Sequence, residues 1–247
     1  MKTNEKVIKS YYKDSKVARS YDRKRFLHGG KVVDEAEKMA VLKLIKTKPG
    51  LNVLDVATGT GRFAIFLAGR GCKVNGLDSS DEMLAIAKRA VASENINVEF
   101  VKGDASDLPF SEDSFDVVVC MRLMIHTDNL ENFLKEFSRV SKCSIIFDTV
   151  NKNSLKAIQV LLSNLLMKPL GLSYLSMYSE QQVIEIARKL NLSVKARVNN
   201  FLIPPAFYLF LPLPLSRLVK SFDDFLLKLT NGKFACAHTW LLQKHQY

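Results

Sequence analysis

Short, nearly all-apolar segments alternate with longer segments of helical spacing through the middle of the chain. The five apolar segments lie at 52–56, 73–78, 97–101, 115–120 and 143–149. Segments 61–71, 81–91 and 130–140 between them carry apolar residues three and four positions apart, which is typical of amphipathic helices. Buried strands separated by helices predict a doubly wound α/β fold whose sheet is mostly parallel and covered on both faces.

The segments that flank this alternation predict further elements. Residues 11–28 are basic and aromatic and favour an irregular or helical N-terminal cap. Residues 31–46 have Val32, Val33, Ala36, Met39, Ala40 and Leu44 at helical spacing. We therefore expect a helical cap over 1–48 and an α/β core over 49–150, which the motifs described below assign to cofactor binding.

The last third of the chain has a different pattern. Residues 155–178 predict a long apolar helical region, and 180–191 a helix that begins at Ser179. A strand at 193–198, a helix at 216–232 and an antiparallel last strand at 234–245 complete seven strands. Leu218, Phe222, Phe225, Leu226 and Leu229 form one stripe of the helix. We expect one domain over 1–247, with 151–247 forming the rest of the sheet and an acceptor-side cap.

The uncharged stretch 201–215, FLIPPAFYLFLPLPL, contains four of the seven prolines. A membrane-spanning helix needs about 20 apolar residues, and prolines break helices. We therefore expect a proline-stiffened cap, which the family resemblance described below implies to line the acceptor side of a pocket. A hydrophobic subcore, a dimer interface and contact with a membrane surface are the alternatives.

Charge changes this picture only in part. The formal net charge is +11, with +8 in residues 1–48, −5 in 49–140 and +8 in 141–247. Basic flanks attract anionic partners such as phosphates or anionic lipid, although a solvated lysine-rich surface has the same composition. The four cysteines are scattered and predict neither a disulfide framework nor a metal site. Without an apolar signal segment, we expect a cytoplasmic protein, with membrane-peripheral binding as an extension.

The strongest candidate chemistry lies at the ends of the first three predicted strands. Gly59 and Gly61 follow the first strand, where glycine lets a ligand approach the backbone. Asp55 precedes this turn and could meet an ammonium group. Asp78 ends the second strand, where a carboxylate can bind both hydroxyls of a ribose. Asp104, after the third strand, can accept a hydrogen bond from an adenine amine.

These motifs occur in the order LDVATGTG, GLDSSDEML, GDASDLPF and SFDVVVCMRLMIH. They resemble the class I S-adenosylmethionine-dependent methyltransferases, and among these the group that includes ubiquinone and menaquinone C-methyltransferases. The resemblance covers about 21–148 and implies S-adenosylmethionine as cofactor. It implies that the cofactor is bound by Tyr21, Asp55, Ala57, Gly59, Thr60, Gly61, Asp78, Ser79, Asp104, Ala105 and Met121. The segment RVSKCSIIFD lacks the Pro-Gly-Gly turn of many relatives, which argues against a close match to the quinone enzymes.

Methyl transfer from a sulfonium is an in-line displacement, so alignment of the acceptor contributes most, up to ~7–11 kcal/mol. His126 follows the fourth strand and is the candidate general base, if the acceptor needs one. A histidine that only braces the next helix is the alternative. Arg122 could hold an anionic acceptor or form a surface salt bridge.

Four functions fit these observations to different degrees. The sequence favours methyl transfer to a small, apolar or lipid-like acceptor. The basic flanks alone favour an RNA or protein methyltransferase, but the segment 120–123 lacks the motifs of nucleic-acid amine methylases. The third function is an NAD(P)-dependent oxidoreductase, because residues 59–64 formally fit an NAD(P)-binding G-x-G-x-x-A pattern. The positions of Asp55, Asp104 and Ala105 favour a sulfonium cofactor instead. The fourth function is a partner subunit that binds the cofactor without catalysis. The sequence does not fix the oligomeric state.

Overall fold

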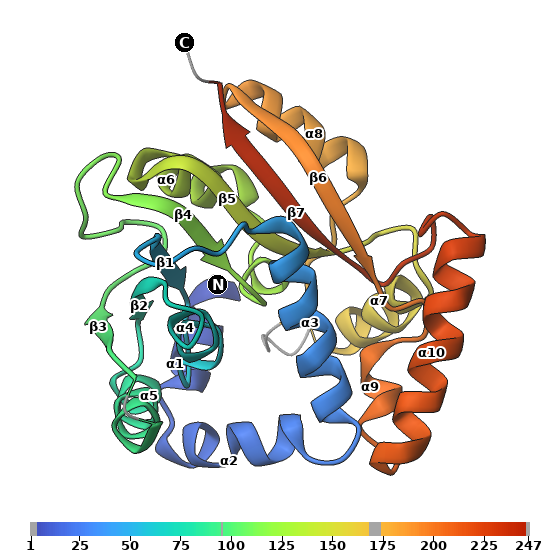
Figure 1. Ribbon diagram of the computed structural model, residues 1–247. Helices are drawn as coiled ribbons and strands as arrows, with labels where there is room; N and C mark the ends of the chain where they lie inside the picture. The colour runs from blue at the N-terminus through green and yellow to red at the C-terminus, as the bar shows by residue number, and fades with distance from the viewer. Residues whose placement is uncertain (1–3, 95, 168–173, 246–247) are drawn as a thin grey trace.

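The computed structural model describes residues 4–94, 96–167 and 174–245. Its centre is a seven-stranded sheet in the order β3-β2-β1-β4-β5-β7-β6 (Figure 1). The strands are β1 (Asn52–Val56), β2 (Lys73–Asp78), β3 (Val98–Lys102), β4 (Phe115–Cys120), β5 (Ser141–Val150), β6 (Leu192–Asn200) and β7 (Ala237–Lys244). Strands β1 to β5 are parallel, and β7 runs antiparallel between β5 and β6. The predicted fold class is confirmed, with an antiparallel last strand.

Helices cover both faces of this sheet. Helices α3 (Gly30–Leu44), α4 (Arg62–Ala68) and α5 (Asp81–Glu94) lie on one face, and α6 (Leu130–Val140) and α8 (Glu180–Lys189) on the other. Two serines cap helices: the Ser80 hydroxyl accepts from the Met83 N–H at 3.2 Å, and Ser179, the predicted helix start, forms a capping box with Gln182.

The alternation of side chains along each strand produces two cores. On β4, Val117 and Val119 pack against α3 and α4, whereas Val118 and Cys120 pack on the side of α6 and α8. The strands are apolar on both faces because each face is covered. The carboxyl ends of β1, β2, β3 and β4 are thereby left as one free edge, where a ligand can bind.

The N-terminal segment is helical rather than irregular. Helix α1 (Asn4–Tyr12) and helix α2 (Ser15–Phe26) precede α3. Near the sheet edge, α1 contacts the short 3-10 helix Met124–His126, and α2 contacts α5. The apolar face of α3 is rotated from the predicted one. Met39 is 50% exposed, whereas Glu37 is 5% exposed and therefore buried. Glu37 takes this place because two arginines bind its carboxylate, as described below.

The C-terminal cap departs further from the prediction. Helix α7 spans Leu155–Met167, residues 168–173 lie outside the described part of the chain, and 174–178 are not helical. Helix α9 (Pro205–Tyr208) and helix α10 (Leu213–Leu229) follow β6. Within 201–215, Phe201 and Tyr208 are fully buried and pack together. No helix in the described residues is long and apolar enough to span a membrane.

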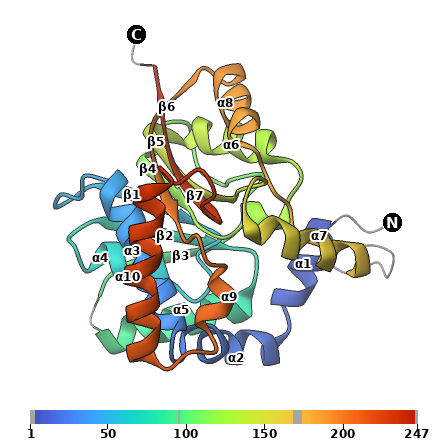
Figure 2. The same cartoon turned by 90° about the vertical axis from the view of Figure 1, so that its right-hand side faces the viewer.

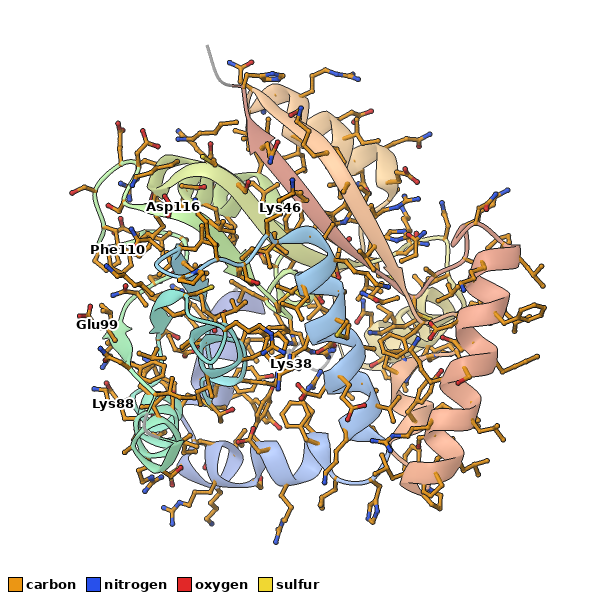
Figure 3. The ribbon with its side chains drawn as sticks, viewed as in Figure 1. Lys38, Lys46, Lys88, Glu99, Phe110 and Asp116 are labelled. Carbon is orange, nitrogen blue, oxygen red and sulfur yellow. The ribbon has the colours of Figure 1, made fainter. Side chains whose placement is uncertain are left out.

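The apolar stripe of α10 faces solvent instead of the core. Leu218 and Phe222 are 69% and 58% exposed, and Phe225 and Leu229 are exposed to a similar degree. Side chains project outward along the side of α10 that faces away from α3 (Figure 3). The buried positions of this helix are Ser216, Asp223 and Leu227. Asp223 is buried because its carboxylate accepts hydrogen bonds from the Leu202 and Ile203 N–H groups, at 2.9 and 2.7 Å.

Candidate functional site

A cavity of about 870 Å³, open to solvent, lies beyond the carboxyl ends of β1, β2, β3 and β4. The fold brings to it ten residues singled out from the sequence, which lie at the ends of four different strands or belong to α2. They are Tyr21, Ala57, Gly59, Asp78, Ser79, Asp104, Ala105, Met121, Arg122 and His126. Asp55, Thr60 and Gly61 do not line it. The roles of all thirteen in binding remain predictions.

The turn between β1 and α4 has a left-handed backbone that opens it to a ligand. Ala57, Gly59 and Gly61 have φ angles of 56°, 58° and 84°. A Cβ added at Gly59 would meet no atom within 4 Å, so open space lies beside this backbone. A Cβ at Gly61 would lie 3.1 Å from the Cβ of Ala87 on α5. Gly59 thus leaves room for a ligand, whereas Gly61 permits close packing of α4 against α5.

Asp78 connects the glycine turn to the end of β2. Its carboxylate accepts hydrogen bonds from the Gly59 N–H and the Ser80 N–H, both at 2.9 Å. Burial raises the pKa of Asp78, against the lowering effect of these backbone donors. The side chain also lines the cavity. Asp78 can therefore hold the turn in shape and present a carboxylate to a ligand hydroxyl.

Asp55 and Thr60 lie beneath the turn rather than in the cavity wall. The Asp55 carboxylate is buried and accepts from the Thr58 hydroxyl at 2.6 Å. Burial raises the pKa of Asp55 to about 7, although the Thr58 hydrogen bond opposes the shift. The Thr60 hydroxyl donates to Asp22 of α2 at 2.9 Å. In this arrangement both side chains brace the turn.

Asp104 receives an unexpected partner from the N-terminal helix. Lys9 of α1 forms an ion pair with its carboxylate, and Ser106 donates to it through its N–H and its hydroxyl. Burial raises the pKa of Asp104, but Lys9 and Ser106 outweigh it and the net pKa is lowered. The Asp104 carboxylate is thus charged at neutral pH and oriented at the cavity.

Helix α1 contributes cavity residues that sequence reasoning missed. Ile8, Lys9 and Tyr12 line the cavity, and the Tyr12 carbonyl accepts from the Ser80 hydroxyl at 2.9 Å. The Tyr12 ring lies 5.9 Å from the Tyr21 ring and 6.3 Å from His126, centroid to centroid. The aromatic pair Tyr11–Tyr12 among lysines was the available signal, but only the fold shows which ring turns inward.

His126 lies in a short 3-10 segment (Met124–His126) after β4 and lines the cavity. Burial, together with the nearby Arg25 and Lys156, lowers the pKa of His126 to about 4. The imidazole is therefore neutral at pH 7 and can accept a proton, although the two cations disfavour the protonated form.

The Arg122 side chain does not form the surface salt bridge that the sequence left open; it pairs with the buried Glu37. It has a φ of 68°, its N–H donates to the Asp148 carboxylate, and its guanidinium donates to Glu37 at 2.8 Å. Arg62 donates to the other Glu37 oxygen at 2.8 Å. One buried carboxylate therefore joins α3, α4 and the end of β4, and its ion pairs are shielded from water. A left-handed non-glycine residue in a cavity wall indicates backbone strain at this site.

Comparison with known proteins agrees with this geometry. Residues 53–143 match the family model described as "Methyltransferase domain". The chain is 34% identical over 142 residues to a demethylmenaquinone methyltransferase of Listeria monocytogenes. This match covers 56% of this chain and 58% of the relative. A demethylmenaquinone methyltransferase of Clavibacter sepedonicus is 40% identical over 85 residues, or 34% of either chain. The chain resembles a class I S-adenosylmethionine-dependent methyltransferase. It spans less than two thirds of the length of these relatives.

Solved structures of methyltransferases share the fold over almost the whole chain. The magnesium protoporphyrin IX methyltransferase of Synechocystis PCC 6803, solved with bound SAH, superposes with a TM-score of 0.70 at 14% identity. The match covers 98% of this chain and all of that one. A Thermotoga maritima protein described as a SAM-dependent methyltransferase, "possible histamine N-methyltransferase", gives 0.67 at 21% identity over 94% of this chain and 98% of that one. At these identities the likeness concerns the fold.

Proposed function

We propose that the protein transfers a methyl group from S-adenosylmethionine to a small acceptor with an apolar body. The observation that carries this proposal is the cavity at the carboxyl ends of β1 to β4, where the glycine turn, Asp78 and Asp104 meet. The methyltransferase domain at residues 53–143 and the named relatives support it.

The cavity suits the chemistry of this cofactor. Asp78 offers a carboxylate for the ribose hydroxyls, and Asp104 offers one for the exocyclic amine of adenine. Leu77, Met83, Ala105 and Phe133 supply an apolar wall for the adenine ring. The open space at Gly59 lets the methionine part approach the backbone. Asp55 is buried beneath the turn and does not line the cavity. Its carboxylate would attract the ammonium group of the cofactor electrostatically from behind the turn.

The bound cofactor would supply an electrophilic methyl group on a sulfonium. The chain's own contribution is to align an acceptor with that methyl and to exclude water, because an in-line displacement depends mainly on geometry. Met121 and Tyr12 close the cavity on the side of the 3-10 segment. The neutral His126 is the group that would receive a proton from an acceptor that carries one.

Calorimetric titration tests the cofactor. We expect S-adenosylmethionine and S-adenosylhomocysteine to bind with micromolar dissociation constants and NADH not to bind. Micromolar binding of NADH alone would replace the proposal with an oxidoreductase. Binding without turnover of any acceptor would indicate a non-catalytic partner subunit.

The acceptor is proposed to be small and lipid-like rather than a nucleic acid. The relatives are named for demethylmenaquinone, and a structural neighbour for magnesium protoporphyrin IX. A second cavity beside the first has apolar lining that includes Val33, Ile125, Val160 and Leu209. Turnover of labelled cofactor against total lipid extract and against RNA, with mass analysis of the product, tests this. Saturable activity on RNA alone would reverse the ranking.

We also propose that the acceptor is taken up at an anionic membrane surface. Exposed apolar side chains occur on α7, α9 and α10, which Figure 2 shows along one side of the molecule. Leu209, which follows α9, is exposed and also lines the second cavity, so the apolar surface continues into its mouth. The exposed Arg217 and Lys228 of α10 add positive charge beside the exposed stripe, which suits anionic headgroups.

Sedimentation with lipid vesicles tests this surface. We expect binding to vesicles that contain phosphatidylglycerol, weaker binding to phosphatidylcholine alone, and loss of binding in the triple variant Leu218→Ser, Phe222→Ser, Phe225→Ser. Sedimentation velocity of the same proteins provides the contrast. A wild-type dimer that the triple variant dissociates, with no vesicle binding, would assign the stripe to a subunit interface.

A further inference from the structure

The second cavity shares a wall with the first and carries an unusual charge pattern. Tyr12, Arg122 and His126 line both cavities, so a molecule in the second would lie next to one in the first. Side chains of α2, α3, α7 and α9 complete the second cavity. Three cationic residues, Arg25, Arg122 and Lys156, line it, and no aspartate or glutamate of the described residues does.

Two of these cations have no carboxylate partner. Arg122 is bound to Glu37, as described above. Within the described residues, neither Arg25 nor Lys156 has a carboxylate oxygen within 4.0 Å, the limit for an ion pair. The Arg25 guanidinium lies 5.7 Å from the centroid of the Tyr21 ring, which leaves its N–H donors available.

The surroundings of Lys156 add to this imbalance. The side chains of Arg25 and Lys156 are partly buried. Burial lowers the pKa of Lys156, while Cys236, Asp148 and Glu37 raise it only in part. Ammonium and guanidinium groups away from bulk water are unfavourable unless an opposite charge is near. Glu37 pairs with Arg122 and Arg62, and Asp148 is the other carboxylate that acts on Lys156. Two carboxylates therefore face the three cations of this cavity, and an anionic ligand can supply the missing negative charge.

We infer that the second cavity binds an acceptor with an anionic group, a carboxylate or a phosphate, held by Arg25 and Lys156. The apolar lining accommodates the body of the acceptor, and His126 and Tyr12 face its reacting end beside the first cavity. The acceptor is thus an amphiphilic anion rather than a neutral lipid. This inference rests on the proposed function, because it assigns the first cavity to the cofactor.

Matched probes test the charge requirement. The protein, saturated with S-adenosylhomocysteine, is titrated with 2-naphthoate, 2-naphthyl phosphate and the neutral 2-naphthamide. We expect at least one anionic probe to bind tenfold or more tightly than the amide, and the better of the two identifies the group. Equal affinity for all three, or no binding of either anion, would overturn the inference.

Variants locate the subsite. Arg25→Gln and Lys156→Gln are expected to weaken the anionic probe at least tenfold and to leave the amide within twofold. Arg23→Gln and Lys152→Gln are the matched controls, because both residues are exposed, line neither cavity and have no ion pair among the described residues. Lys156→Arg keeps the charge and should retain binding. Unchanged anion binding in both Gln variants would also overturn the inference.

The affinity for S-adenosylhomocysteine distinguishes failure of the proposed function from failure of the proposed anionic subsite. Neither Arg25 nor Lys156 lines the first cavity, so all variants should bind S-adenosylhomocysteine like wild type, which also reports that they fold. If wild type does not bind S-adenosylhomocysteine, the proposed function fails, and the same probes titrated without it still report whether the anionic subsite exists.

Discussion

Replacement of Asp78 separates two tasks that one side chain performs. Its carboxylate accepts from the Gly59 and Ser80 N–H groups, both at 2.9 Å, and it lines the proposed cofactor cavity. A hydrogen bond to a charged group contributes about 1.5–3 kcal/mol, and a buried donor left without an acceptor costs a similar amount. In Asp78→Asn the amide oxygen can satisfy one donor, while its NH₂ group faces the other. We therefore expect the free energy of unfolding to fall by about 1.5–3 kcal/mol.

The same variant should lose affinity for the cofactor. An amide can still contact one ribose hydroxyl but no longer supplies a charged acceptor, so we expect S-adenosylhomocysteine to bind at least about tenfold more weakly, which corresponds to ~1.4 kcal/mol. Urea unfolding and calorimetric titration measure the two effects. Asp81→Asn is the matched control, because Asp81 is exposed and only pairs with the exposed Lys102. It should change either quantity by less than about 1 kcal/mol.

The two measurements refute different parts of the reasoning. Unchanged affinity in a folded Asp78→Asn protein would remove Asp78 from the ligand site. Unchanged stability would mean that the two backbone hydrogen bonds do not hold the glycine turn. Loss of affinity in Asp81→Asn as well would point to a general effect of negative charge near α5.

Three further predictions concern buried charge, the apolar cap and pH. Glu37→Gln should lower the free energy of unfolding by about 3–5 kcal/mol, because the partly buried Arg122 loses its counter-charge and Arg62 keeps only Asp34, whereas the exposed Glu35→Gln should be nearly neutral; equal urea midpoints would contradict this. Phe201→Ala should cost about 3–5 kcal/mol at 1% exposure, but Phe222→Ser at 58% less than about 0.5, and thermal unfolding that ranks them the other way would reject the assignment of core and surface. The pKa of His126 is lower in the folded chain, about 4, than in the unfolded chain, about 6.5, so the folded state binds fewer protons in this range. Stability should therefore fall by about 2.6 kcal/mol as pH drops from about 6.5 to 4, and the stability of His126→Asn should fall less steeply; parallel pH curves would exclude this.

The local pattern of the sequence was sufficient for the sheet. The strands β1, β2 and β4 were predicted with their observed bounds, because a strand covered on both faces must be apolar at nearly every position. The glycine turn and the aspartates at strand ends were predicted to meet, since carboxyl ends of parallel strands share one edge. Ten of the thirteen residues singled out do line one cavity.

Only the tertiary structure decided which faces are buried and which charges are paired. The apolar stripe of α10 has the spacing of a core-facing helix, yet Leu218 and Phe222 face solvent, because the buried side of α10 is fixed by Asp223 and its backbone donors. Glu37 is a typical surface residue by sequence, but the approach of Arg62 and Arg122 makes its burial favourable. Arg25 and Lys156 lie 131 positions apart along the chain, so only the packing of α2 and α7 brings their charges to one cavity. Helical periodicity reports which residues share a face; it does not report what that face meets.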